Sequence, residues 1–369
     1  MLTSLEICAG AGGQALGLEQ AGFRHLAVVE NDAHACETLR INRDHSKVEA
    51  SRRWPVLEMN VEELRGEDFW GVDLVAGGVP CPPFSVAGKQ LGADDERDLF
   101  PKALEIIRDA SPKAILLENV RGLSSAKFAD YRNRVITNLE ELGFTCWWQV
   151  INASEHGVPQ LRPRFVLVGV RHEYASSFEW PNPVGTPPTV GEALYPMMAA
   201  NGWPGATEWA ARANGIGPTL VGGSKKHGGP DLGPTRAREA WLRLGVNGLG
   251  VADDPPGPDF PPDERPKLTV SMAAVLQGFP PSWRFYGRKT AAYRQVGNAF
   301  PPPVAKAIGR SIARSLGSIP PQKLAATSRM PTATVRGADA APTADREAVA
   351  AKAYTSPACR KVGTSRVST

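Results

Sequence analysis

Cysteine is scarce in this chain. Its 369 residues include five cysteines, and none of them stand at the short spacings of zinc ligands. They are odd in number and spread along the whole sequence: Cys8, Cys36, Cys81, Cys146 and Cys359. Such a set argues against a disulfide framework and is typical of reduced thiols. We therefore expect no metal site and a cytoplasmic location.

Long apolar runs are also lacking. No stretch of about 18 apolar residues occurs, and the N-terminus lacks the pattern of a secretory signal, so we expect no membrane span. A large excess of charge is missing as well, because 42 lysines and arginines face 38 aspartates and glutamates, for a net charge of +4. That balance is compatible with a polyanionic partner and does not establish one.

The chain is long enough for roughly two domains. In residues 3–170, short apolar stretches alternate with helical patterns, which predicts an α/β fold with a doubly wound, mostly parallel sheet. After residue 170 the alternation breaks, and glycine, proline and tryptophan become frequent. We predict one domain from residues 1–170 and 287–317, a smaller irregular domain at 171–286, and a disordered tail at 318–369. Strands are predicted at residues 5–8, 26–30, 73–76, 114–117, 146–151 and 165–170, and helices at 14–21, 32–39, 99–108, 131–142 and 303–316.

One cysteine differs from the others in its surroundings. Cys81 follows the apolar run 72–76, a predicted buried strand, and stands between Pro80 and Pro82. Such a segment cannot continue a strand or a helix, so a stiff loop at the carboxyl end of that strand carries the thiol. Ligands in open α/β sheets bind at that end of the strands. A buried core position is the alternative, and the prolines argue against it.

A glycine-rich turn follows the first predicted strand. Gly10, Gly12 and Gly13 precede a helix, and such a turn lets a nucleotide approach the backbone at the helix N-terminus. Glu30 ends the second predicted strand, where a carboxylate binds ribose hydroxyls in dinucleotide folds. Together they predict an adenosine-containing cofactor; a merely tight turn and a solvated acid are the alternatives.

Further charged groups stand beside other predicted strands. Glu118 ends one of them, so its carboxyl group would share the crevice with Cys81 and have its pKa raised by burial. Arg162 and Arg164 alternate before the last strand and would point to one side of an extended segment, beside an anion. Residues 217–229 are glycine-rich and cationic, which is typical of a nucleic-acid surface. Solvated side chains and a flexible loop are the alternatives.

These blocks, in this order, resemble the DNA (cytosine-5) methyltransferases. The resemblance covers residues 3–170 and 266–316 and implies an S-adenosylmethionine-dependent methyltransferase with a target-recognition domain. Its last two blocks are Leu276 to Pro280 and Tyr293 to Ala299. It implies these catalytic residues: Cys81, Glu118, Arg162 and Arg164. It implies these cofactor-binding residues: Gly10, Ala11, Gly12, Gly13, Glu30, Asn31, Asn60, Val61, Pro80, Leu99, Asn298 and Ala299. The residues expected to contact DNA are Ser85, Gln160, Thr219, Lys225 and Lys226.

The resemblance also implies a mechanism. The Cys81 thiolate would add to C6 of a cytosine turned out of double-stranded DNA, so that C5 becomes reactive. Glu118 would hold and protonate N3, while Arg162 or Arg164 would favour the thiolate. The implied enzyme needs no metal and no membrane, is a monomer, and is nucleoid-associated in a restriction-modification or epigenetic context.

Three positions depart from the family pattern. Cys8 stands where the family usually has phenylalanine, Asn60 where it has aspartate, and Pro82 where it has glutamine. None of these changes removes a catalytic group. Two other functions remain open: cytosine-5 methylation of transfer RNA, and a catalytically silent DNA-binding regulator. The presence of Cys81, Glu118 and Arg164 argues against the regulator. The irregular region from Arg171 to Pro266 favours DNA over RNA as the substrate, because such a region can read base sequence in the grooves.

Overall fold

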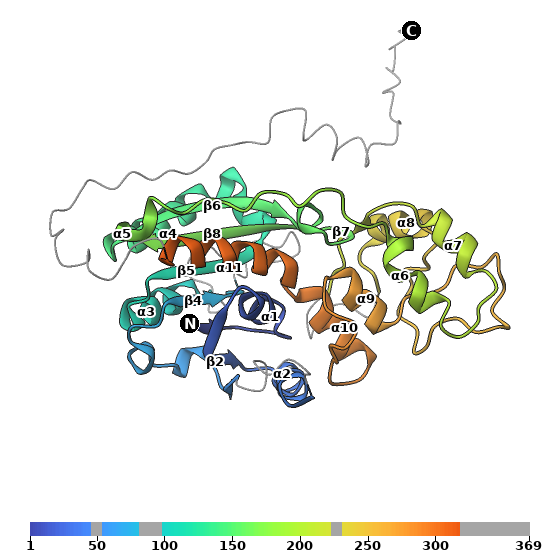
Figure 1. The fold of residues 1–369 in the computed structure, drawn as a ribbon, viewed down its shortest axis with the longest axis horizontal. Helices are drawn as coiled ribbons and strands as arrows, with labels where there is room; N and C mark the ends of the chain where they lie inside the picture. Colours follow the sequence, from blue (N-terminus) through green and yellow to red (C-terminus); the bar gives the residue numbers. More distant parts are fainter. Residues whose placement is uncertain (46–53, 81–97, 223–230, 318–369) are drawn as a thin grey trace, which may run out of the picture.

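The computed structural model describes residues 1–45, 54–80, 98–222 and 231–317. These residues form a larger lobe around a sheet and a smaller helical lobe at one end of it (Figure 1). Several predicted residues, among them Cys81, Pro82, Ser85, Lys225 and Lys226, lie outside the described residues, as does the tail from residue 318.

The larger lobe contains a seven-stranded sheet. In it the strands follow the order β3-β2-β1-β4-β5-β8-β6, parallel from β3 to β5, while β8 runs antiparallel to both of its neighbours. The prediction of a mostly parallel sheet is therefore confirmed. The strands are β1 (Leu2–Ile7), β2 (Phe23–Glu30), β3 (Val56–Glu58), β4 (Leu74–Gly77), β5 (Ala114–Val120), β6 (Phe144–Asn152) and β8 (Pro163–Arg171).

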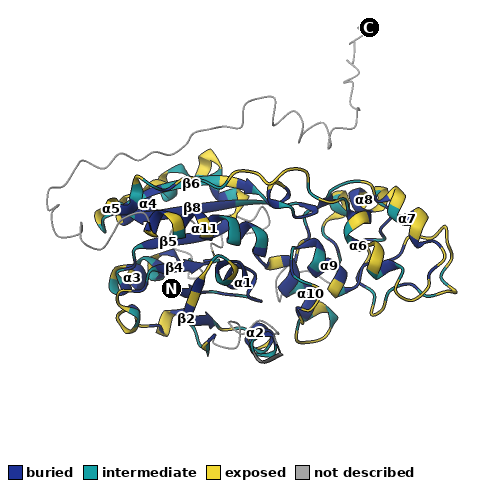
Figure 2. Cartoon of the chain, viewed as in Figure 1, coloured by how far each residue is buried: buried dark blue, intermediate teal, exposed yellow. Residues whose placement is uncertain are grey.

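Helices cover both faces of this sheet, as the unbroken apolar strands require. Along β5, Ile115 and Leu117 face one core together with α3 and α4, whereas Leu116 faces the other core with α1 and α11. Figure 2 shows the strands buried between these layers. The helices of this lobe are α1 (Gly13–Gln20), α2 (Ala33–His45), α3 (Phe100–Ala110), α4 (Ala129–Glu141), α5 (His172–Ala175) and α11 (Pro302–Gly317).

The last helix returns to pack on the first. A Cβ added to Gly17 of α1 would lie 2.4 Å from the carbonyl oxygen of Pro302 and 2.5 Å from Cβ of Ala305 in α11. Only glycine lets the two backbones approach so closely. The end of the described chain is thus part of the core of the larger lobe.

The smaller lobe is more helical than its sequence suggests. Among its described residues, five short helices surround a core that includes Trp209, Trp241 and Tyr293, each of them fully buried. Two short parallel strands link this lobe to the larger one, since β7 comes just before β8 and pairs with β9. The elements are α6 (Val190–Met198), α7 (Ala206–Arg212), α8 (Thr235–Arg243), α9 (Val270–Leu276), α10 (Lys289–Asn298), β7 (Gln160–Leu161) and β9 (Gly217–Pro218).

Candidate active site

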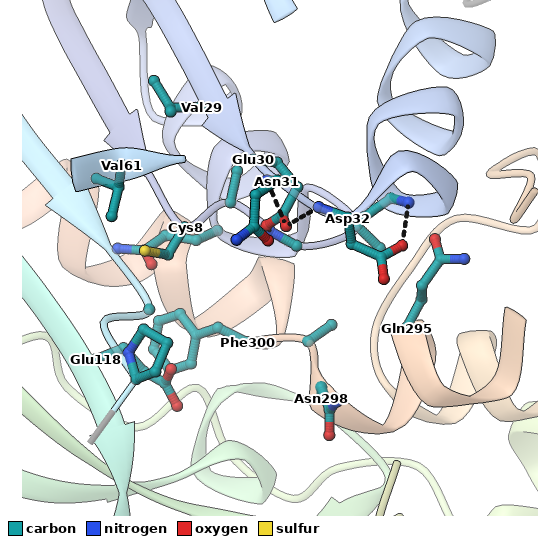
Figure 3. Close-up of a pocket in the computed structure, with 18 of the residues that line it drawn as sticks. Cys8, Val29, Glu30, Asn31, Asp32, Val61, Glu118, Gln295, Asn298 and Phe300 are labelled. Carbon is teal, nitrogen blue, oxygen red and sulfur yellow. Dashed lines mark hydrogen bonds between the residues drawn. The ribbon is translucent and has the colours of Figure 1, made fainter. Parts of the chain in front are cut away.

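A cavity of about 310 Å³ opens at the carboxyl ends of β1, β2, β4 and β5. This is the edge at which ligands bind in open α/β sheets. Figure 3 shows Glu30 and Asp32 on one side of the cavity, with Glu118 and Asn298 on the other. Predicted residues that line it are Gly10, Ala11, Glu30, Asn31, Val61, Pro80, Leu99, Glu118, Asn298 and Ala299.

Glu30 organises the turn at the end of β1. Its carboxylate accepts hydrogen bonds from the backbone N–H groups of Gly10 (2.8 Å), Asn31 (2.8 Å) and Asp32 (2.7 Å). Gly10 adopts φ of +55°, a conformation that glycine favours. The predicted glycine turn and the predicted acid therefore meet in one structure at the wall of the cavity.

Three predicted cofactor residues lie away from the cavity lining. A Cβ on Gly13 would lie 2.2 Å from the carbonyl oxygen of Phe300, and one on Gly12 would lie 2.7 Å from Cδ2 of Leu39. These glycines therefore serve close packing of α1. The amide of Asn60 accepts a hydrogen bond from the backbone N–H of Glu62 (3.2 Å), which caps a short helical turn.

Cys8 lines the cavity as a neutral thiol. Burial, followed by the nearby charges of Glu30 and Glu6, raises its pKa to about 12. It follows β1 with a φ of +51°, so the strand ends one residue before the predicted end. A neutral side chain of this size gives the cavity wall a weakly polar surface, at the position where the resemblance implies an aromatic ring.

Glu118 and Arg164 form a buried ion pair, with Arg164 Nε 2.8 Å from Glu118 Oε1. The pairing of β5 with β8 explains the contact, because Arg164 lies opposite Val120, two residues beyond Glu118 on the same face. Burial raises the pKa of Glu118 despite the opposing effects of Arg164 and Arg162. The carboxyl group is thereby suited to donate a proton to a bound base.

Glycine and asparagine shape the space between Glu118 and the chain that leads to position 81. A Cβ on Gly78 would lie 3.3 Å from Glu118 Oε2, so glycine leaves room for the carboxyl group. Asn119 donates a hydrogen bond from Nδ2 to the carbonyl oxygen of Val79 (2.9 Å). Pro80, the last described residue before Cys81, lines the same cavity as Glu118.

Arg162 lies apart from the carboxyl group that Arg164 holds. Its guanidinium is fully buried and donates to the carbonyl oxygens of Leu220 (2.8 Å), Gly297 (2.7 Å) and Ala299 (3.0 Å). It precedes β8 and lies between β7 and β8, outside the extended run that would keep alternate side chains on one side. The two arginines therefore have different bonding partners, although the charge of Arg162 still acts on the pKa of Glu118.

Two residues expected to contact DNA are also engaged within the protein. Gln160 is fully buried, and its amide donates to Gln277 Oε1 (2.7 Å) and accepts from the backbone N–H of Leu220 (2.9 Å). Contact with DNA would require this residue to leave the interior. Thr219 is half-buried, and its hydroxyl donates to the carbonyl oxygen of Leu161 (2.5 Å).

Several residues of the cavity were not predicted from the sequence. Asp32, Met59 and Phe300 are sequence neighbours of predicted residues, so they would have been predicted if each site had been extended by one residue. Arg294 and Gln295 lie in α10, within the block Tyr293 to Ala299, of which only Asn298 and Ala299 were predicted to bind the cofactor. In the described ranges no helix is long and apolar enough to cross a membrane. The same residues contain no group of three or more acidic, histidine or cysteine side chains placed to hold a metal ion.

Comparison with known proteins places these features in a family. Residues 2–220 and 229–314 match the family model for C-5 cytosine-specific DNA methylases. The chain is 56% identical over 316 residues to Type II methyltransferase M.NaeI of Lentzea aerocolonigenes, covering 85% of this chain and 75% of the relative. It is 49% identical over 318 residues to Type II methyltransferase M.NgoMIV of Neisseria gonorrhoeae, covering 85% of this chain and 98% of the relative.

Solved structures support the same fold. A DNMT2 variant of Spodoptera frugiperda superposes with a TM-score of 0.58 at 18% identity, covering 85% of this chain and all of that one (100%). Dnmt2 of S. pombe gives a TM-score of 0.54 at 16% identity, with 86% and 99% covered. From the matched blocks, the sheet and the site together, this chain belongs to the C-5 cytosine-specific DNA methylase family.

Proposed function

We propose that this enzyme transfers a methyl group from S-adenosylmethionine to C5 of a cytosine within a specific duplex DNA site, with Cys81 as the nucleophile. The observation that carries the proposal is the position of Glu118, a buried carboxyl group paired with Arg164, which lines the same cavity as Glu30 and the glycine turn that Glu30 holds. An acid near the base and a site for a nucleoside thus adjoin the segment that leads to Cys81.

The residues of the cavity fit an adenosyl cofactor. The Glu30 carboxylate stands where ribose hydroxyls bind in related folds, and Val61, Leu99 and Phe300 supply apolar wall for a flat base. When bound, the cofactor supplies an activated methyl group on a sulfonium sulfur. Glu30 and Asn298 would hold that molecule in the cavity that Glu118 also lines.

The chain's own groups would activate the cytosine. The Cys81 thiolate adds to C6, and electron density moves to C5, which then accepts the methyl group. Glu118 in its acid form donates a proton to N3 as negative charge develops on the ring. Arg164 holds the carboxyl group of Glu118 in place. Water then removes the proton from C5, the thiolate leaves from C6, and N3 returns its proton to Glu118.

Duplex DNA is the proposed substrate, and restriction-modification is the proposed context. Two relatives at 49% and 56% identity are named Type II methyltransferases, which supports DNA over RNA. Chemistry at C5 and C6 requires the cytosine outside the helical stack, at a cost of a few kcal/mol. The smaller lobe, which adjoins the cavity through α10, would read the sequence around that base.

The experiment that tests this proposal is transfer of labelled methyl groups to duplex DNA and, separately, to total RNA. We expect wild-type protein to label DNA and the Cys81→Ser variant to label neither. The matched control is Cys359→Ser in the tail, which should retain full activity. Label in RNA alone would overturn the choice of substrate, and full activity of Cys81→Ser would overturn the mechanism.

A further inference from the structure

The segment that leads from β9 to Gly222 contacts the wall of the candidate cofactor cavity. A Cβ on Gly222 would lie 2.4 Å from the carbonyl oxygen of Arg294 and 2.6 Å from Asn298 Oδ1. A Cβ on Gly297 would lie 2.3 Å from the backbone nitrogen of Gly222. Arg294 and Asn298 both line the cavity, so this contact lies directly behind its surface.

Buried hydrogen bonds hold the same segment to the end of α10. The guanidinium of Arg162 donates to the carbonyl oxygen of Leu220 on one side and to those of Gly297 and Ala299 on the other. Since Arg162 is fully buried, these bonds lie in a low dielectric, and breaking them would leave a charge without partners. Residues 217–222 and the end of α10 are therefore joined through the buried side chain of Arg162.

A second set of amides strengthens this link. Gln160 accepts from the backbone N–H of Leu220, and its own N–H group donates to Gln277 Oε1. Gln277 in turn donates to the carbonyl oxygen of Ala299 (2.6 Å), another residue of the cavity. Two separate routes thus connect Leu220 with the same short stretch of cavity wall.

We infer that Gly222 is a positioning residue for cofactor binding. Because it has no side chain, Asn298 can keep its place in the wall of the cavity, from which an added Cβ would displace it. This inference rests on the proposed function, because it takes the cavity as the cofactor site. Glycine is required here for space, since neither Gly222 nor Gly297 has a positive φ.

The test is Gly222→Ala, measured as affinity for S-adenosylhomocysteine by calorimetry without DNA. We expect the dissociation constant to rise about tenfold, which corresponds to about 1.4 kcal/mol. The matched control is Gly215→Ala in the same lobe, where the nearest atom is Cδ2 of Leu244 at 3.0 Å, the end of a flexible side chain. Its affinity should equal that of wild type. Unchanged affinity of folded Gly222→Ala would overturn the inference.

A measurement on wild-type protein covers the case in which Gly222→Ala does not fold. Addition of S-adenosylhomocysteine should slow hydrogen exchange in residues 217–222, where Leu220 donates to Gln160. The absence of any such protection would contradict the link. If wild type fails to bind S-adenosylhomocysteine at all, the proposed function itself fails, so the two failures are distinguishable.

Discussion

Glu118 is a carboxyl group held in the interior by one arginine, and this environment sets its chemistry. Burial raises its pKa, so the proton-donating form extends to higher pH than in water. Glu118→Gln should lower the rate constant of methyl transfer by about 10²–10⁴-fold, the range for a missing general acid. Single-turnover methylation of duplex DNA measures this, with the exposed Glu105→Gln as the control. A rate constant close to that of wild type would remove Glu118 from the mechanism.

The same shift predicts a pH dependence. The active form of Glu118 is protonated, so the rate of methyl transfer should fall as the pH rises through its raised pKa. In Glu118→Gln this descending limb should be missing, because an amide does not ionise in that range. A descending limb that is identical in both proteins would assign it to another group.

Glu6 gives a separate test on stability. It is fully buried on β1, and among the described residues neither carboxyl oxygen has a hydrogen-bond partner, so burial raises its pKa well above 4.5. Between pH 4.5 and the raised pKa, Glu6 is ionised in the unfolded chain and protonated in the folded chain. Folding stability therefore decreases as pH rises, by up to about 1.4 kcal/mol per unit.

Glu6→Gln removes this pH dependence, because the amide stays neutral in both states. Denaturant unfolding at pH 5 and pH 8 should show the variant gaining stability over wild type at the higher pH. The exposed Glu63→Gln serves as the control and should show no such gain. Equal pH dependence in wild type and Glu6→Gln would mean that Glu6 has an unrecognised partner.

At the scale of elements, the contact between α1 and α11 depends on Gly17. Gly17→Ala places a methyl group against backbone atoms of α11, and we expect stability to fall by about 1–3 kcal/mol, as for an overpacked core. Thermal or denaturant unfolding measures it. Gly317→Ala, also in α11 but with no atom within 4 Å of the added Cβ, is the control. An increase in the stability of the Gly17→Ala variant would show that α1 and α11 can move apart without loss of packing.

The elements that the sequence predicted are those with local signals. Apolar runs and glycine turns marked the strands of the sheet except β3, which was missed. The ends of the predicted elements moved by at most three residues, except that α2 continues to His45 and not to residue 39. Since β5 continues to Val120, Glu118 lies within the strand and not at its end, where it was predicted. The short helices of the smaller lobe were missed, because they stand between glycine-rich and proline-rich loops and pack on tryptophans that are distant in the sequence.

The partners of Arg162 were beyond prediction for a related reason. They are backbone carbonyls that lie 58, 135 and 137 residues away in the sequence. Every residue has a carbonyl, so no side-chain pattern marks these three. The Glu118–Arg164 pair, by contrast, could be anticipated because two opposite charges stood next to strands of one sheet.

At the scale of the whole molecule, residues 318–369 are predicted to be dispensable for catalysis. The family model ends at residue 314, and 98% of M.NgoMIV is covered by a match to 85% of this chain. Deletion of the tail should leave kcat and the melting temperature unchanged. Methylation assays and thermal unfolding check this, and a large drop in activity without unfolding would give the tail a direct role.

DNA affinity should depend on salt, because binding of lysine side chains to phosphates releases counterions. Replacement of Lys225 and Lys226 by alanine should reduce the slope of log affinity against log salt by about 2, since each phosphate that a lysine neutralises adds nearly one to that slope. Lys102 and Lys127, replaced together, provide the control. An unchanged slope in the Lys225 and Lys226 variant would place those side chains away from DNA.

The central claim, that the thiol at position 81 bonds to C6 of the target cytosine, has one most direct measurement. Duplex DNA that carries 5-fluorocytosine at the methylated site should trap the enzyme, because no proton can leave C5. Mass spectrometry of the digested adduct should find the base linked to the peptide that contains Cys81, and only when S-adenosylmethionine is present. A link at any other residue, or completed methylation of ordinary DNA without any trapped adduct, would contradict the account.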